Sequence, residues 1–207
     1  MDNPFIIGIT GGSGSGKTSL LRDLRRQFSV DELCILSLDD YYIEREKQEV
    51  DEKGIRNFDR PLAVDLKAFY QDIERLLRNE EVTRKEYTFN NRKKTPKTLT
   101  FKPAPLLALE GLYVFYDPVI REKIDLKVFI HASPELKVIR RIRRDEAERN
   151  YPLEDVLYRY ENHVLPSFSR DIARFHETSD IVINNNSAYD TGLDVLTGFL
   201  KYKLQES

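Results

Sequence analysis

The sequence is poor in the features that mark secreted and membrane-spanning proteins. It has a single cysteine and no tryptophan, so no disulfide can form within the chain. That cysteine, Cys34, lies in the apolar run 33–36, where a buried and unreactive thiol is expected. No apolar stretch approaches the ~20 residues that a membrane-spanning helix needs, and the first residues do not resemble a signal peptide. We therefore expect a soluble, cytoplasmic protein with no membrane partner.

An excess of charge of one sign is also missing. The 33 basic and 35 acidic residues give a formal net charge of −2, so no overall basic field favours binding to nucleic acid. The three histidines, His131, His163 and His176, are too widely spaced for a metal-ligand motif, and we expect them to be structural or surface residues. The length of 207 residues fits a single domain, 1–207, and assembly into a homo-oligomer is left open.

A glycine-rich motif stands out against this background. Residues 11–18 read Gly-Gly-Ser-Gly-Ser-Gly-Lys-Thr, between the apolar run 5–9 and a helical pattern. Glycines let successive N–H groups face an anion, and a helix N-terminus adds partial positive charge. In this pattern the lysine reaches the β- and γ-phosphates and the threonine hydroxyl binds Mg²⁺. The motif therefore predicts binding of ATP or GTP by Gly11, Gly12, Ser13, Gly14, Ser15, Gly16, Lys17, Thr18 and Ser19.

Strand-like and helical patterns alternate along the chain. The expected strands are 5–10, 33–37, 106–109, 126–131 and 180–183, and the expected helices are 17–28, 65–78, 116–122, 134–148, 153–163 and 190–203. This alternation predicts an α/β fold of the P-loop NTPase type, with a doubly wound parallel sheet and helices on both faces. Ligands in such folds bind beyond the carboxyl ends of the strands.

One segment, at about 80–103, interrupts the alternation. Its two ends alternate with period 2 around a basic stretch, which predicts a small β-hairpin flap carried on the main sheet. A solvated basic loop is the alternative. The flap is preferred because Tyr87 and Phe89 would otherwise be exposed aromatic side chains without a role.

Carboxylates follow two of the expected strands. Asp39 comes directly after 33–37 and is a candidate general base, although it or Asp40 can instead cap a helix. Glu110 ends the strand at 106–109, where an unpaired charge is costly unless a cation lies nearby. We therefore expect Glu110 to bind Mg²⁺ together with Thr18, with a salt-bridged glutamate as the alternative. Asp59 follows Phe58 in a proline-stiffened loop and can accept hydrogen bonds from sugar hydroxyls, with an ordinary turn aspartate as the alternative.

Arginines cluster at 140–149, within a helical lid expected at about 140–160. Arg141 and Arg144 share one face of this helix. Guanidinium groups of this kind can close over a triphosphate and stabilise transferring phosphoryl oxygens. The alternative is a solvated face paired with neighbouring carboxylates; a nucleic-acid patch is less favoured, because no aromatic residues are interleaved.

Taken together, these motifs resemble the uridine kinase family. The resemblance spans about 5–185 and rests on the phosphate loop, the blocks 35–42 and 57–61, Tyr87-x-Phe89, Glu110-Gly111 and 140–145. It implies phosphate transfer from ATP or GTP to the 5′-hydroxyl of uridine or cytidine. It also implies roles for individual residues: Asp39 as general base; Asp59 and Arg141 on the ribose; Tyr42, Phe58, Tyr87 and Phe89 around the sugar and base; Arg144 and Arg149 at the phosphates.

The chain departs from the family pattern at three places that include base-reading positions. It has Asn90-Asn91-Arg92 in place of a family histidine, Asn150-Tyr151 in place of Gly-Arg, and Arg159 in place of a glutamine. A related P-loop kinase of another sugar-bearing metabolite, such as a phosphoribulokinase-like enzyme, is therefore the alternative function. A nucleotide-dependent switch ATPase is less favoured, because it would leave Asp39, Asp59 and the flap without a purpose.

Overall fold

The computed structural model describes residues 3–89, 95–149 and 151–206. The side chains of Glu148 and Arg149 lie outside this description, as do Asn90, Asn91, Arg92 and Asn150. The role predicted at Arg149 therefore stays a prediction, and the departure from the family pattern at 90–92 lies outside the described residues.

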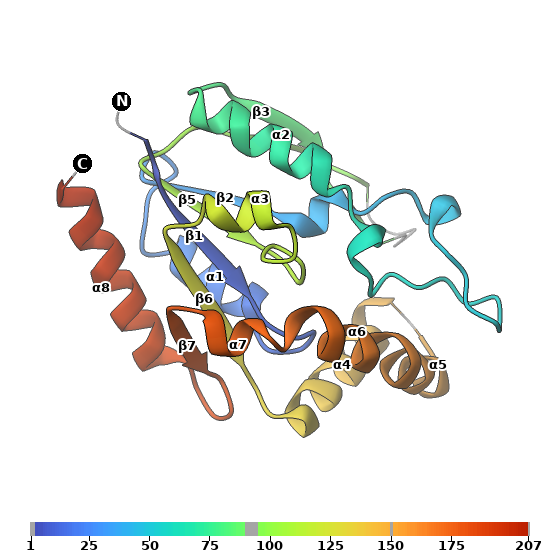
Figure 1. Ribbon diagram of the computed structural model, residues 1–207. Coiled ribbons are helices and arrows are strands. Elements are labelled where there is room, and N and C mark those ends of the chain that lie inside the picture. The colour runs from blue at the N-terminus through green and yellow to red at the C-terminus, as the bar shows by residue number, and fades with distance from the viewer. Residues whose placement is uncertain (1–2, 90–94, 150, 207) are drawn as a thin grey trace.

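Five parallel strands form the central sheet, as the alternating pattern predicted (Figure 1). The strands are β1 (Phe5–Thr10), β2 (Leu33–Ser37), β5 (Leu106–Glu110), β6 (Leu126–His131) and β7 (Ile181–Asn184), in the order β2-β5-β1-β6-β7. Ile9 of β1 pairs with Glu110 of β5, and Ser37 of β2 pairs with the same Glu110. The register therefore brings the carboxyl ends of these three strands to one edge, where the phosphate loop begins.

Helices cover both faces of the sheet, which confirms the doubly wound architecture (Figure 1). On one face, α2 (Leu66–Leu77), α3 (Pro118–Glu122) and α7 (Phe175–Thr178) pack over a core that includes Phe69, Ile120 and Phe175. On the other face, α1 (Lys17–Arg25) and α8 (Asp190–Glu206) pack through residues such as Leu24 and Leu196. Burial of each such side chain stabilises the fold by about 1.5–3 kcal/mol.

A helical arm extends beyond the carboxyl edge of the sheet. It contains α4 (Pro134–Arg149) and α5 (Leu153–Arg159), followed by two π-helical segments, Tyr160–Val164 and Phe168–Ile172, around the short α6 (Leu165–Ser167). The helix predicted at 153–163 is thus only the first part of a longer helical stretch. Pro166 has no N–H to donate, and the wider turns on either side accommodate the missing hydrogen bond.

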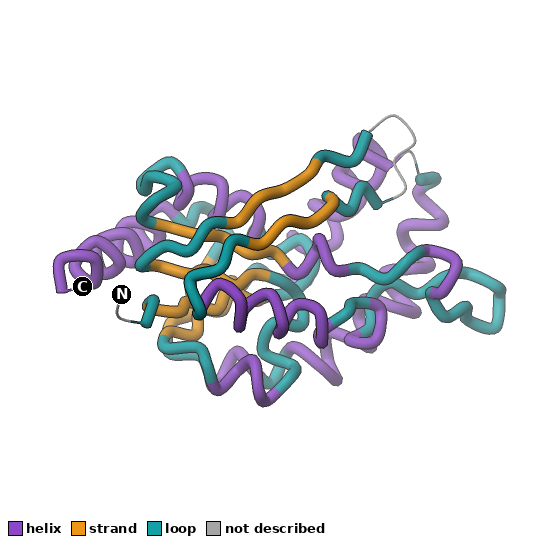
Figure 2. The backbone as a smooth tube through the Cα atoms, turned by 90° about the horizontal axis from the view of Figure 1, so that it is seen from above, coloured by secondary structure: helices purple, strands orange, loops and turns teal. Residues whose placement is uncertain are grey.

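The predicted hairpin at 80–103 is present, with β3 (Val82–Lys85) antiparallel to β4 (Thr98–Phe101). It forms a two-stranded sheet of its own instead of joining the central one (Figure 2). Strand β4 lies beside β2, so the hairpin places the segment that follows β3 near the carboxyl end of β2.

Candidate active site

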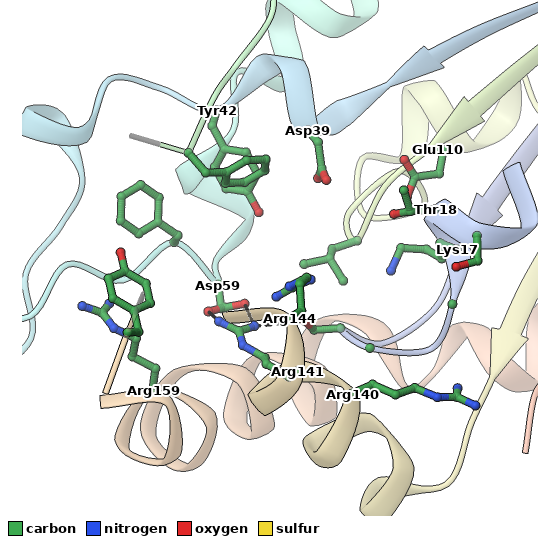
Figure 3. Close-up of a pocket in the computed structure, with 18 residues that line it drawn as sticks. Lys17, Thr18, Asp39, Tyr42, Asp59, Glu110, Arg140, Arg141, Arg144 and Arg159 are labelled. Atoms are coloured by element: carbon green, nitrogen blue, oxygen red, sulfur yellow. Dashed lines mark hydrogen bonds and ion pairs between the residues drawn. The ribbon is translucent and has the colours of Figure 1, made fainter. Parts of the chain in front are cut away.

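A cavity of about 440 Å³ opens beyond the carboxyl ends of β1, β2 and β5 (Figure 3). Its walls come from the phosphate loop, the turn after β2, the loop before α2, the end of β5 and the helical arm. Most of the predicted site residues line it: Ser13, Gly14, Gly16, Lys17, Thr18, Ser19, Asp39, Tyr42, Phe58, Asp59, Phe89, Glu110, Arg141 and Arg144. The sequence motifs, far apart along the chain, therefore meet in one place.

The phosphate loop has the backbone conformation that its glycines predict. Gly14 and Gly16 adopt φ of 78° and 102°, which side chains other than glycine rarely tolerate. A Cβ at Gly14 would also lie 2.5 Å from the Lys137 carbonyl oxygen. The Lys17 Nζ donates to the carbonyl oxygens of Gly11 and Gly12, at 2.9 and 3.2 Å. The ammonium group is thus held over the loop, where an anion would bind.

Burial lowers the pKa of Lys17, while the charges of Glu110 and Asp39 oppose this shift. Beside its bonds to the Gly11 and Gly12 carbonyl oxygens, the Lys17 ammonium has a further N–H group from which a phosphate oxygen can accept. Gly11, Gly12 and Ser15 are buried within the loop and are absent from the cavity wall. Their predicted part in nucleotide binding, through backbone N–H groups, stays a prediction.

Glu110 ends β5 as a buried carboxylate with 4% of its surface exposed. Its Oε2 accepts a hydrogen bond of 2.8 Å from the Ser37 hydroxyl. Burial and then the nearby charge of Asp39 raise the pKa of Glu110, and Lys17 only partly compensates. An acid in this setting favours a bound cation, so its surroundings fit a Mg²⁺ ion.

The side chain of Thr18, the first polar group of α1 after Lys17, is exposed to the same cavity. No cluster of three or more histidine, cysteine or acidic side chains that could hold a metal occurs among the described residues. Mg²⁺ does not require one, because it keeps several waters and is bound through one or two protein groups plus substrate phosphates. Thr18 and Glu110 could therefore hold the ion as its protein ligands, and this role stays a prediction.

Asp39 lies in a single 3₁₀ turn, Leu38–Tyr41, directly after β2. The Ser37 hydroxyl accepts from the Asp39 N–H and so caps this turn. Asp39 points into the cavity near Glu110 and Lys17 (Figure 3). Asp40 instead accepts a hydrogen bond from the Tyr87 N–H, which links the turn to the segment after β3 and gives Asp40 a structural role.

Asp59 and Arg141 form a two-pronged ion pair across the middle of the cavity. The Arg141 Nη1 and Nη2 lie 3.1 and 3.3 Å from the two Asp59 oxygens. Burial alone would lower the pKa of Arg141, but Asp59 and Asp145 raise it overall. Asp145 is fully buried and also accepts from Arg144. The pair is therefore fixed in position, and one further bond, from Arg141 to the Ser13 hydroxyl at 3.0 Å, ties it to the phosphate loop.

Aromatic rings surround the part of the cavity beyond this ion pair. The ring of Tyr42 lies 6.2, 5.4 and 5.4 Å from the rings of Phe58, Tyr87 and Phe89, centre to centre. Phe89 has φ of 50°, a strained conformation of the kind that gathers at functional sites. Tyr87 packs against Phe89 at 5.0 Å and does not line the cavity itself; it supports the rings that do.

Sequence reasoning assigned no site role to Arg140, Tyr151 and Arg159, yet all three line the cavity. The Arg140 Nη2 donates to the Asn185 carbonyl oxygen, and the Asn185 side chain donates to the Ser15 carbonyl oxygen in the phosphate loop. The signal for Arg140 was its place beside Arg141. Arg159 and Tyr151 stood out only as departures from a family pattern.

The histidines lie away from these groups. His163 is buried and bonded through Nε2 to Asp51 at 2.8 Å. The rings of His131 and His176 lie 5.3 Å apart. None of the three lines the cavity. No helix among the described residues is long and apolar enough to cross a membrane.

Comparisons with known proteins identify the family of the chain. Residues 6–192 match the model of the Phosphoribulokinase / Uridine kinase family. The chain is 34% identical over 202 residues to a uridine kinase of Borrelia duttonii, covering 98% of this chain and 97% of that protein. It is 31% identical over 206 residues to a uridine kinase of Streptococcus pneumoniae, covering 100% and 97%.

Solved structures share the fold at low sequence identity. A putative fructose transport system kinase from Silicibacter sp. TM1040 superposes with a TM-score of 0.67 at 15% identity, over 88% of this chain and 90% of that one. A possible uridine kinase from Bacillus stearothermophilus gives 0.58 at 18%, over 88% and 89%. These matches support the P-loop kinase fold alone.

Fold and cavity together define a P-loop kinase that phosphorylates a nucleoside or another small molecule. The chain belongs to the Phosphoribulokinase / Uridine kinase family.

Proposed function

We propose that this protein transfers the γ-phosphate of ATP or GTP to the 5′-hydroxyl of uridine or cytidine, with Mg²⁺ bound at Thr18 and Glu110. The observation that carries the proposal is the buried pair of Asp59 and Arg141 between the phosphate loop and the aromatic rings. A carboxylate and a guanidinium held side by side can accept from and donate to two vicinal hydroxyls at once. A ribose bound there has the phosphate loop on one side and ring stacking for its base on the other.

The residues would act in order along the cavity. Asp59 and Arg141 orient the ribose so that its 5′-oxygen faces Asp39. Asp39 accepts the 5′-hydroxyl proton as that oxygen bonds to the γ-phosphorus and the bond to the β-phosphate oxygen breaks, which releases the nucleoside diphosphate. Lys17, Arg144 and Arg149 stabilise negative charge on the phosphoryl oxygens. Mg²⁺, held by Thr18 and Glu110, would neutralise part of the negative charge of the phosphates.

A kinase of a different small acceptor, such as a phosphorylated sugar, is the second candidate. The arginines that line the cavity, Arg140, Arg141, Arg144 and Arg159, are compatible with a more anionic acceptor. That acceptor would not use the rings of Tyr42, Phe58 and Phe89, and for this reason the nucleoside is favoured. A switch ATPase would use neither the rings nor Asp59.

Replacement of the ribose 2′-hydroxyl tests the proposal. A site built to bond a hydroxyl rejects the analogue that lacks it, because its buried polar groups lose a partner. We expect 2′-deoxyuridine to be phosphorylated with a kcat/KM lower than that of uridine by roughly 10²-fold or more, and Asp59→Ala to erase most of this preference. Asp65→Ala, which removes the cap of α2, controls for general destabilisation. Equal use of the two nucleosides by the unmodified enzyme would contradict ribose recognition here.

A further inference from the structure

Arg159 lies at the end of the cavity farthest from the phosphate loop. Figure 3 shows it on the opposite side from Lys17, with Asp59 and Arg141 between them. Its guanidinium lies 5.2 Å from the centre of the Tyr151 ring, and its Nη1 donates to the Arg56 carbonyl oxygen at 2.9 Å. The cation is therefore held in place by a ring and a backbone group.

The hydrogen-bonding capacity of this guanidinium is not used up. Its Nε is buried and has no hydrogen-bond partner among the described residues. Within the same part of the chain, no carboxylate lies within ion-pair distance of Arg159. Its Nη2 also makes no hydrogen bond to the described residues, and it is not among their buried atoms. Because Arg159 lines the cavity, this remaining N–H group can donate to an acceptor atom on the bound molecule.

The position of Arg159 indicates which atom that is, given the proposed function on which this inference rests. If the ribose is bound at Asp59 and Arg141, the base extends from the glycosidic nitrogen toward the aromatic rings. The ring carbon opposite that nitrogen is then the deepest point of the base and faces the far end of the cavity. It carries an oxygen, a pure acceptor, in uracil and an amino group, a donor, in cytosine.

We propose that Arg159, with its guanidinium over the Tyr151 ring, makes the enzyme selective for uridine over cytidine by donating to the 4-oxygen of the base. An arginine has only donors, so the cytosine amino group would place donor against donor and leave the guanidinium N–H unpaired. A glutamine at this position would accept as well as donate and would admit both bases.

The test compares kcat/KM for uridine and cytidine in four proteins. The unmodified enzyme is expected to favour uridine by about tenfold or more, the cost of one unpaired buried donor. Arg159→Gln should bring the two values within about threefold of each other, mainly through KM for the nucleoside, because the amide serves either base. Arg159→Lys, which still only donates, should keep uridine ahead. Arg143→Gln, on an exposed residue of the same arm, should leave the ratio unchanged.

A substrate analogue gives the same information without any variant. The pyrimidin-2-one riboside lacks the 4-substituent, so we expect it to fall between uridine and cytidine. Equal use of uridine and this analogue, or an unchanged ratio in Arg159→Gln, would overturn the role of Arg159 while leaving the kinase assignment standing. Failure of every nucleoside as acceptor for the unmodified enzyme would overturn both.

Discussion

Glu110 is a buried carboxylate whose negative charge is unfavourable unless a cation binds beside it. It is 4% exposed, and its pKa is raised above the ordinary 4.5 by burial and by Asp39. The folded protein therefore binds more protons at this site than the unfolded chain does between pH 4.5 and neutrality. It follows that the free energy of unfolding falls as the pH rises through this range.

Unfolding in urea at pH 5 and pH 7, with a chelator present, measures this contribution. We expect Glu110→Gln to lose less stability than the unmodified protein between the two values, by on the order of 2 kcal/mol. Addition of Mg²⁺ should restore stability at pH 7 in the unmodified protein only. If the free energy of unfolding of the two proteins changes equally with pH, the pKa of Glu110 is not raised as described above.

Asp39 is predicted to act on a proton and not on the metal. Asp39→Asn keeps the size of the side chain but removes its ability to accept a proton. We expect kcat to fall by roughly 10²–10⁴-fold, while the affinity for the nucleotide, measured by calorimetry, stays close to that of the unmodified enzyme. If kcat barely changes and the Mg²⁺ requirement rises instead, Asp39 belongs to the metal site.

At the scale of elements, the phosphate loop depends on glycine for two separate reasons. Gly14 combines φ of 78° with a distance of 2.5 Å from a potential Cβ to the Lys137 carbonyl oxygen. Gly14→Ala must therefore shift the loop away from α4, and we expect a loss of about 1–3 kcal/mol of stability together with a marked loss of nucleotide affinity.

Gly198→Ala is the matched control. Gly198 lies in α8, and a Cβ there would meet nothing within 4 Å. Alanine should stabilise this helix by about 0.5–1 kcal/mol and leave nucleotide binding unchanged. Thermal unfolding of both variants, with and without ATP, separates the two cases. An alanine at 14 that behaves like the one at 198 would contradict the role given to the loop geometry.

The strands and helices that follow from a local pattern of apolar residues were predictable from the sequence. Strands β1, β2 and β6 begin and end where the apolar runs placed them. Helix α1 ends at Arg25 and not at residue 28, because the N–H groups of Arg26 and Gln27 bond to carbonyls only three residues back, which tightens and ends the last turn. The π-helical turns around Pro166 and the separate sheet of β3 and β4 depend on packing between distant segments, which no local pattern reports.

The residues of the candidate site also fall into those that the sequence predicted to meet and those that it did not. Glu110 ends β5, Asp39 lies in the turn after β2, and Lys17 follows the loop after β1. The rule that ligands bind at the carboxyl ends of strands was therefore enough to predict that they meet. Asp59 and Arg141 pair across 82 positions of sequence, and only the fold of the helical arm brings them together. Arg159 escaped assignment because its partners, Tyr151 and the Arg56 carbonyl, give no sequence signal.

At the scale of the whole molecule, the sheet supplies one half of the cavity and the segments beyond it supply the other. The phosphate loop, Asp39 and Glu110 stand at the strand ends, while Asp59 lies in the loop before α2 and Arg141 in α4. The ion pair and the Ser13 contact join the two halves. Phosphate donor and acceptor are thus expected to bind at opposite ends of a single cavity, and the assignment of 1–207 to one domain stays a prediction.

Identification of the product formed from ATP, Mg²⁺ and an acceptor tests the central claim most directly. With uridine, the account predicts stoichiometric formation of ADP and uridine 5′-monophosphate, identified by mass spectrometry and ³¹P NMR, and only trace ADP without an acceptor. Release of inorganic phosphate at the same rate with and without uridine, or phosphorylation of a sugar phosphate in preference to any nucleoside, would contradict it.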